Sequence, residues 1–177
     1  MKLHFTILPP SKMSQWSVRL AKRLTTKYEC WFVVNNKNLY PHVTLFSAQV
    51  PKKQFASLSD SLENLAARFS ALDLQIVGLS TPRATGGGWM ALKIKSNNHL
   101  TKFREQVRKL VSGKIRFKPY YNPHITLAKY KNPRDERSVR SQTKLPTKKF
   151  RAKILAVCVS DAEFSQVYKI LKKYELK

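Results

Sequence analysis

Acidic residues are scarce in this 177-residue chain. It has 10 Asp and Glu against 34 Lys and Arg, a formal net charge of +24. This imbalance produces a strong positive field that attracts polyanions, nucleic acid above all, although a basic surface can also serve solubility alone. Apolar residues still make up 42% of the chain, so a packed core is expected and disorder is not.

Cysteines are few, and membrane spans and flexible linkers are absent. Cys30 and Cys158 lie in apolar, strand-like segments and are interpreted as buried residues, not as a disulfide framework or metal ligands. No stretch approaches the length of a membrane span, and Pro9-Pro10 interrupts the opening segment too early for a signal peptide. We expect a soluble, cytoplasmic monomer without membrane contact.

Two segments of the sequence are nearly identical to each other. YPHVTLF contains His42 and Thr44, and NPHITLA contains His124 and Thr126, with the two histidines 82 positions apart. In a strand, residues i and i+2 point to the same face, so each phrase presents one imidazole beside one hydroxyl. The preceding proline suits the first position of a strand.

Two facing imidazoles suit an in-line displacement at phosphorus. The attacking and leaving oxygens lie on opposite sides of the phosphorus, so one needs a base and the other an acid, and histidine serves as either near neutral pH. The threonine hydroxyls would donate to the non-bridging oxygens. A zinc site lacks a third nearby ligand, and a serine-type triad lacks its carboxylate and nucleophile elbow. A single such histidine would more often be structural.

Hydrophobic periodicity predicts alternating strands and helices. The expected strands include residues 3–7, 30–34, the two motif segments, 72–76, 90–94 and one central strand over 150–159. The expected helices cover residues 11–24, 55–69 and 100–111. Residues 130–149 are predicted to form a long mobile loop. The tail, 166–176, fits a helix as well as a strand, and we favour a strand paired with 150–159.

The predicted strands and helices follow one another in a similar order twice along the chain, and each of the two repeats contains one His-x-Thr motif. The pattern indicates a degenerate duplication: an α+β fold of two lobes related by a pseudo-twofold axis. Each lobe is expected to be an antiparallel sheet with helices outside, and a cleft should separate the two. With no Gly/Ser-rich linker between them, residues 1–177 are expected to form one domain with approximate halves 1–80 and 81–177.

At these residues the chain resembles the 2H phosphoesterase superfamily, and within it the 2′-5′ RNA ligases or RNA 2′,3′-cyclic phosphodiesterases. PHVTLF and PHITLAK match the two family motifs, and the opening MKLHFTILPP is similar to the family's first strand and proline turn. The resemblance implies that His42 is the general acid and His124 the base, with both threonines holding phosphate. Lys129 stands where the family often has arginine, and Pro41 where it often has leucine.

The sequence therefore predicts a metal-independent phosphodiesterase, without cofactor, that opens a 2′,3′-cyclic phosphate at RNA ends to a 2′-phosphate. Its partner would be RNA or a nucleotide with a cyclic phosphate. Alternatives are 2′-5′ RNA ligation, cleavage of a cyclic or oligonucleotide signal, and a non-catalytic RNA-binding module. Turnover of a small cyclic nucleotide would separate the enzymes from the binding module.

Substrate contacts are expected from aromatic and basic residues near the motifs. The predicted substrate-binding residues are Phe46, Tyr121, Lys129 and Arg83. Strand alternation places Phe46 on the face of His42 and Thr44. Further aromatic candidates for base stacking are Tyr40, Tyr120 and Trp89, although core packing is the more common role of an aromatic residue. Loop cations that either contact phosphates or are simply solvated are Lys131, Arg134, Arg137 and Arg140. The remaining histidines, His4 and His99, are expected at the surface or an edge.

Overall fold

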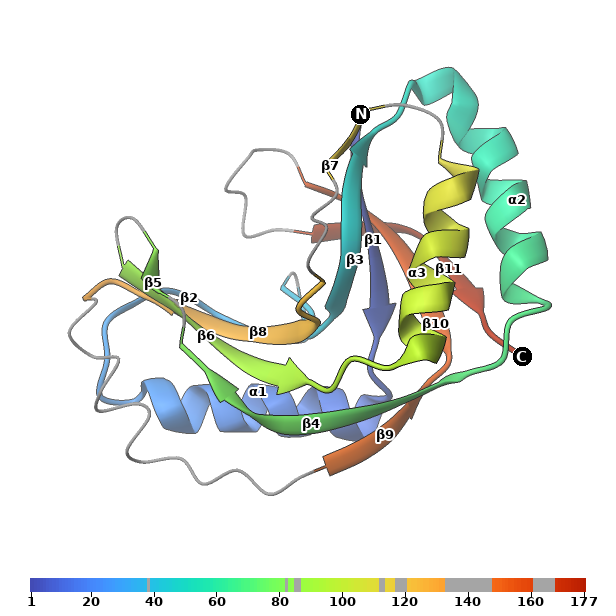
Figure 1. Cartoon of the computed structure of the whole chain (residues 1–177). Helices are drawn as coiled ribbons and strands as arrows, with labels where there is room; N and C mark the ends of the chain where they lie inside the picture. The colour runs from blue at the N-terminus through green and yellow to red at the C-terminus, as the bar shows by residue number, and fades with distance from the viewer. Residues whose placement is uncertain are drawn as a thin grey trace.

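A curled antiparallel sheet with helices on its outer side forms the protein in this computed structural model (Figure 1). The structure describes residues 1–37, 39–81, 83–84, 87–111, 114–116, 121–132, 148–160 and 168–177. Its strands are β1 (Lys2–Leu8), β2 (Cys30–Val33), β3 (Val43–Gln49), β4 (Leu72–Ser80), β5 (Arg83–Ala84), β6 (Gly87–Ile94), β7 (Lys114–Arg116), β8 (His124–Tyr130), β9 (Lys148–Ala152), β10 (Ile154–Ser160) and β11 (Tyr168–Glu175). Its α-helices are α1 (Ser11–Thr25), α2 (Phe55–Ala66) and α3 (Asn98–Leu110), and a 3-10 turn (Lys52–Gln54) precedes α2.

The two motif strands, β3 and β8, meet in the middle of the sheet. The strand order is β11-β10-β1-β3-β8-β6-β4-β9, with β2 paired to β8, β7 to β3 and β5 to β6. One backbone pair, Val43 with Ile125, joins β3 to β8. We call β11, β10, β1, β3 and β7 lobe 1, and β2, β8, β6, β5, β4 and β9 lobe 2. Figure 1 shows the strands of the two lobes running in different directions. The expected α+β fold with two related lobes is confirmed.

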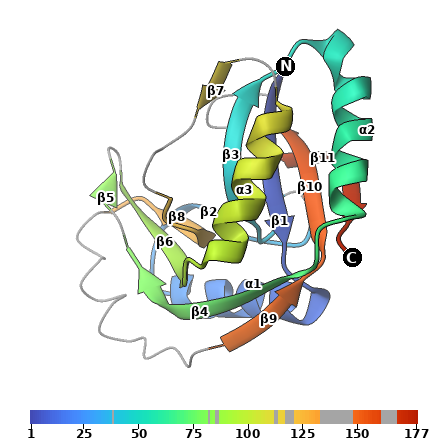
Figure 2. The ribbon, with the colours of Figure 1, turned by 45° about the vertical axis from the view of Figure 1, so that its right-hand side comes forward.

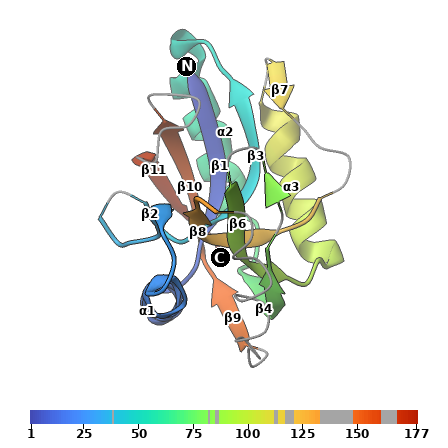
Figure 3. The same ribbon diagram turned by 90° about the vertical axis from the view of Figure 1, so that its left-hand side faces the viewer.

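The two lobes exchange elements of the repeat. In chain order β1-α1-β2-β3 corresponds to β6-α3-β7-β8. Yet β2 pairs with the motif strand of lobe 2, β7 pairs with that of lobe 1, and α1 and α3 likewise contact β8 and β3. Figures 2 and 3 show α1 on one side of the sheet, apart from α2 and α3. The halves 1–80 and 81–177 therefore describe the repeat along the chain and do not coincide with the lobes in space.

A β-bulge interrupts the alternation of lobe 1 directly after its motif. Thr6 of β1 pairs with Thr44, but the preceding residue, Phe5, pairs with Phe46, so Leu45 has no partner in this register. Adjacent residues of β1 face opposite sides, so Phe46 lies on the face away from Thr44. Its ring stacks on Phe5, 4.7 Å between centroids, and is buried in the core. The prediction that Phe46 shares the motif face is wrong, because the bulge reverses the alternation.

Lobe 2 contains the same bulge at the same place. Ala91 of β6 pairs with Thr126, whereas Met90 pairs with Ala128, which leaves Leu127 as the extra residue. A bulge of this kind bends the strand and increases its local twist. Both lobes therefore curl directly after their threonine, and the duplication extends to backbone irregularities.

Apolar residues of the strands and helices meet on the side of the sheet away from the motifs. The alternating Leu3, Phe5 and Ile7 are fully buried, and Leu62 of α2 and Phe103 of α3 join the same core. His4 and Thr6, on the other face of β1, are also buried, so β1 is covered on both faces rather than half-buried as its alternation predicts.

The C-terminal strands depart from one prediction and confirm another. The expected single strand over 150–159 is wrong: β9 and β10 are separate, with Lys153 between them. β9 pairs with β4 at the edge of lobe 2, and β10 pairs with β1 inside lobe 1, so the chain changes lobes at this point. The tail does form a strand, β11, paired with β10 as expected.

The expected loop over residues 130–149 is shorter at both ends, since Tyr130 belongs to β8 and Lys148 begins β9. Residues 133–147 of the expected long loop lie outside the described residues. Within the described part of the chain, no helix has the length and apolar character needed to cross a membrane. Cytoplasmic location, monomeric state and the single-domain boundary stay predictions.

Gly88 provides a test of the packing in lobe 2. It pairs with Tyr130, which is fully buried, and a Cβ at position 88 would overlap the hydroxyl and ring of that tyrosine. We expect Gly88→Ala to lower the free energy of unfolding by about 1–3 kcal/mol, as overpacked cores generally do. Urea denaturation measures it, and an unchanged midpoint and slope would show that Tyr130 does not need this glycine.

Candidate active site

The register between β3 and β8 places the two motifs crosswise. Val43 and Ile125 form an antiparallel pair, so the residues flanking them oppose one another in reverse order. His42 therefore lies opposite Thr126. In the same way, Thr44 lies opposite His124. The four side chains therefore share one face of the two strands, which we call the motif face.

Both imidazoles are held in the same way by their own chain. The Nδ1 of His42 is 2.7 Å from the carbonyl oxygen of Tyr40, and the Nδ1 of His124 is 2.9 Å from that of Asn122. A carbonyl can only accept, so Nδ1–H donates in each case, and Nε2 is the basic nitrogen of the neutral ring. The intervening proline keeps the residue before it extended, which brings that carbonyl within reach. Each motif thus fixes the tautomer suited to proton transfer through Nε2.

The two histidines differ in their surroundings. His124 is exposed, whereas His42 is partly buried. Burial lowers the pKa of His42, against the hydrogen bond to Tyr40, which raises it, and a charge on His124 would lower it further. A like charge nearby is expected to have this effect on the pKa of His42.

His4 is a third imidazole on this face, contrary to its expected place at the surface or an edge. It is 9% exposed, because β1 lies between β3 and β10, and its Nδ1 is 3.0 Å from the Ser47 hydroxyl. Burial, followed by the charges of Lys2 and His42, lowers its pKa to about 4. His4 is therefore neutral at physiological pH. The alternation of β1 and its central position are the sequence features that would have placed it here.

A buried arginine and a tyrosine bind the backbone at the bulge of the first His-x-Thr motif, which we call motif 1, the one with His42 and Thr44; motif 2 is the one with His124 and Thr126. Arg104 of α3 is 3% exposed, and its Nε donates to the carbonyl of Leu45, the bulge residue, at 3.0 Å. The Tyr121 hydroxyl donates to the Thr44 carbonyl at 3.1 Å, and the Arg104 guanidinium lies 4.2 Å from the Tyr121 ring centre. Tyr121 precedes motif 2 by three residues, so motif 1 is braced by the segment that leads into the other histidine. The sequence prediction did not include Arg104, although its place on the apolar stripe of α3 was a usable signal.

Of the other residues predicted to bind substrate, some lie near the motif face and some lie outside the described residues. Lys129 pairs with Trp89 across β8 and β6, on the same face as Thr126. Arg83 belongs to β5, but its side chain lies outside the described residues. So do Tyr120, Arg134, Arg137 and Arg140. His99 lies on α3, stacked on Phe69 at 4.9 Å between ring centres.

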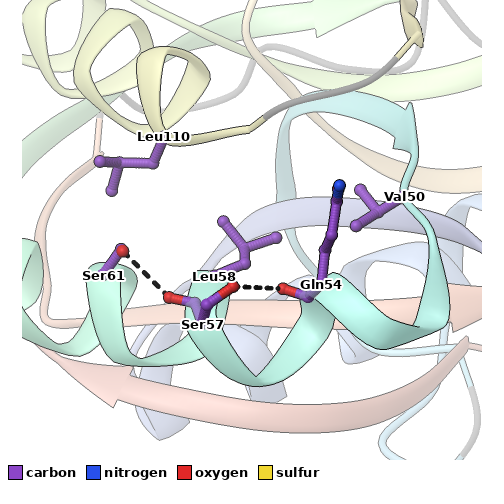
Figure 4. A pocket seen from close by; sticks show the side chains of 6 residues that line it. All are labelled: Val50, Gln54, Ser57, Leu58, Ser61 and Leu110. Carbon is purple, nitrogen blue, oxygen red and sulfur yellow. Dashed lines mark hydrogen bonds between the residues drawn. The ribbon is translucent and has the colours of Figure 1, made fainter.

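Pockets occur both between helices and beside the first motif. One, of about 230 Å³, lies between α2 and α3, and Figure 4 shows its lining of Val50, Gln54, Ser57, Leu58, Ser61 and Leu110. The other, of about 330 Å³, adjoins motif 1 and is lined by Leu8, Pro9, Ser11, Ser14, Gln15, Asn36, Tyr40 and Pro41. The expected cleft over the histidines themselves stays a prediction. In the described part of the chain, no three His, Cys, Asp or Glu side chains are grouped as metal ligands.

Tyr121→Phe tests whether Tyr121 positions motif 1 or touches substrate. The variant keeps the ring but removes the bond to the Thr44 carbonyl, and we expect a stability loss of about 0.5–1.5 kcal/mol. Turnover of a substrate should fall through kcat, with KM unchanged, because Thr44 would be less well held. A raised KM with unchanged kcat would instead show direct substrate contact.

His4 predicts a specific pH dependence of stability. Its folded pKa of about 4 lies below the ordinary 6.5, so the unfolded chain binds the proton more readily. The His4 contribution is complete above pH 6.5 and is lost as the pH falls toward 4, by about 3 kcal/mol in all. Replacing His4 with Asn, which can still bond Ser47, should flatten the stability curve in this range. Parallel curves for the two proteins would contradict this assignment.

Comparison with known proteins identifies the family and the fold of the chain. The family model for the 2′-5′ RNA ligase superfamily matches residues 9–163. Among solved structures, TT0787 of Thermus thermophilus is similar with a TM-score of 0.73 at 18% identity, over 99% of this chain and 98% of that one. Escherichia coli LigT complexed with 3′-AMP is similar with a TM-score of 0.63 at 17% identity, over 99% and 98%.

A third similar structure is the MHV ns2 PDE domain, with a TM-score of 0.59 at 14% identity, over 96% of this chain and 99% of that domain. A search of curated protein sequences gives no match. At these identities the structural likeness shows the fold, whereas the family model spans most of the chain. The chain belongs to the 2′-5′ RNA ligase superfamily, a group of 2H phosphoesterases.

Proposed function

We propose that this protein is a phosphodiesterase that opens 2′,3′-cyclic phosphates at RNA ends, leaving a 2′-phosphate. The observation that carries the proposal is the crosswise placement of the two His-x-Thr motifs around the Val43–Ile125 pair. In the in-line transition state at phosphorus, the attacking water oxygen and the leaving 3′ oxygen lie on opposite sides, and the two non-bridging oxygens lie between them. Two imidazoles and two hydroxyls in this order match those four atoms.

In the proposed reaction the histidines act at the two ends of the displacement. The Nε2 of His124 takes a proton from water as the water oxygen attacks phosphorus. The P–O3′ bond breaks as the new P–O bond forms, and the Nε2 of His42 gives its proton to the leaving 3′ oxygen. The products are a 2′-phosphate and a 3′-hydroxyl. Thr44 and Thr126 donate hydrogen bonds to the non-bridging oxygens, where negative charge accumulates.

The assignment of acid and base comes from the family resemblance and must accommodate the lowered pKa of His42. Partial burial keeps His42 neutral in the free protein, whereas an acid must start protonated. A phosphate anion beside His42 favours the charged form of its ring and raises its pKa. Binding of the substrate would then favour protonation of His42, which supplies the proton that His42 donates.

The charge of the chain supports a polyanionic substrate. A formal net charge of +24 favours RNA over a neutral or cationic ligand. The structure of LigT with 3′-AMP is one of a relative, and we extend nucleotide binding to this chain as part of the proposal. RNA ending in a cyclic phosphate would supply both the reacting group and further phosphates for the basic surface.

Single replacements of the motif histidines test the mechanism. We expect His42→Ala and His124→Ala each to lower turnover of 2′,3′-cyclic AMP by about 10²–10⁴-fold, the usual value of one general acid or base. His99→Ala is the matched control, because His99 stacks on Phe69 in another part of the protein. Circular dichroism should show all three variants folded.

Either motif variant retaining the wild-type rate would refute the mechanism. The same assay with RNA oligomers ending in cyclic phosphate identifies the preferred substrate. Binding of these oligomers without turnover would instead favour the non-catalytic RNA-binding module.

A further inference from the structure

A lysine stands directly beside the second motif histidine, on the neighbouring strand. Lys93 of β6 pairs with His124 of β8, and the next residue of β8, Ile125, is buried in the core, so Lys93 and His124 face the other side. In the adjoining pair the Ile94 N–H donates to the Pro123 carbonyl at 3.0 Å. Lys93 and His124 are therefore a non-hydrogen-bonded pair, the kind in which side chains lie closest. Both are exposed, so Lys93 adds a cation to the motif face.

Two further lysines extend this positive charge across the edge of lobe 2. Lys95 lies two residues beyond Lys93, and its N–H donates to the Gln75 carbonyl at 2.8 Å, which continues the ladder between β6 and β4. Gln75 pairs in turn with Lys149 of β9. Lys95, Gln75 and Lys149 thus form one line across three neighbouring strands, which Figure 2 shows side by side, and by alternation they face away from the core. We call Lys93, Lys95 and Lys149 the lysine row.

The contacts of the lysine row among the described residues do not explain it as a stabilising feature. All three lysines are exposed, and none forms a salt bridge with another described residue. Asp73, on the same face of β4, lies 3.8 Å from Arg151 instead. Gly78, the other cross-strand neighbour of Lys93, has no side chain, and a Cβ there would meet no atom within 4 Å, so the surface beside Lys93 is open. Like charges at neighbouring positions repel, so the row costs stability unless an anion binds there.

The corresponding position in lobe 1 carries no charge. The two bulges align Thr6 of β1 with Ala91 of β6, and therefore Leu8 with Lys93. Leu8 is apolar and pairs with Ile154 of β10. The duplicated backbone thus places an aliphatic side chain beside the first motif and a cation beside the second, and the positive charge continues outward from His124 alone.

We propose that the lysine row binds backbone phosphates of the RNA strand whose end reacts at the motifs. The row rests on the proposed function, since it takes the motifs as the place of the reacting phosphate. Neighbouring strands lie about 4.8 Å apart, so the line from Lys95 to Lys149 spans about 10 Å, and Lys93 is about 7 Å from Lys95 along β6. Long lysine side chains at this spacing can follow a flexible single strand over more than one phosphate. An RNA oligomer is therefore a better substrate than a cyclic mononucleotide, whose one phosphate the motifs hold.

Removal of the lysine row tests this proposal by binding alone. The row variant combines Lys93→Gln, Lys95→Gln and Lys149→Gln. The control variant combines Lys52→Gln, Lys53→Gln and Lys109→Gln, which removes the same charge from exposed positions on the 3-10 turn and on α3. Anisotropy of a fluorescein-labelled RNA oligomer ending in a 2′-phosphate measures the Kd at several salt concentrations.

We expect the row variant to bind this oligomer about ten- to a hundredfold more weakly than the control variant does. The slope of log Kd against the logarithm of the salt concentration should fall by about 2, since each contact with a single-stranded phosphate contributes about 0.7. Equal binding by the two variants would overturn the proposal.

Turnover separates the lysine row from the motifs. The kcat/KM for an RNA oligomer ending in cyclic phosphate, divided by that for 2′,3′-cyclic AMP, should fall about tenfold in the row variant and stay unchanged in the control. An unchanged ratio in the row variant would overturn the row and leave the proposed function standing. Loss of RNA binding in the row variant of a protein that turns over neither substrate would refute the proposed function and leave the row as an RNA-binding surface.

Discussion

One antiparallel backbone pair, between Val43 and Ile125, determines the geometry on which the site depends. Both side chains are fully buried, so the joint between the lobes is fixed by the core. Side chains alternate along a strand, and the residues on either side of this pair must therefore emerge together on the opposite face. A one-residue slip in register would turn one of the two motifs into the core, which makes the wrong pairing costly.

The duplication reproduces this backbone and varies the chemistry placed on it. Both motif strands bulge after their threonine. Helix α1 packs on β8, and α3 packs on β3, so the two helices are exchanged in the same way. The side chains then differ: the Leu45 carbonyl accepts from the buried Arg104 side chain, whereas the Leu127 carbonyl accepts from the backbone N–H of Val34. A reaction with two unlike ends requires such a difference, because one imidazole must give a proton while the other takes one.

Periodicity was sufficient for the features that depend on neighbouring residues in the chain. The alternation around Phe5 and the spacing of the two motifs predicted β1, β3 and β8 and the shared face of each histidine and threonine. The bulge at Leu45 depends on how β1 pairs with β3, which no local pattern contains, so Phe46 was assigned to the wrong face. The break at Lys153 and the burial of His4 likewise follow from partner strands distant in sequence.

In the proposed mechanism the two motifs form one site for one phosphate. Nitrogen-15 NMR of labelled histidine, recorded while inorganic phosphate is added, tests this directly. We predict that the Nε2 signals of His42 and His124 shift together, with the same Kd and one phosphate per chain, and that replacing either histidine weakens the response of the other. Shifts with two different Kd values, or a response of only one of the two rings, would contradict the account.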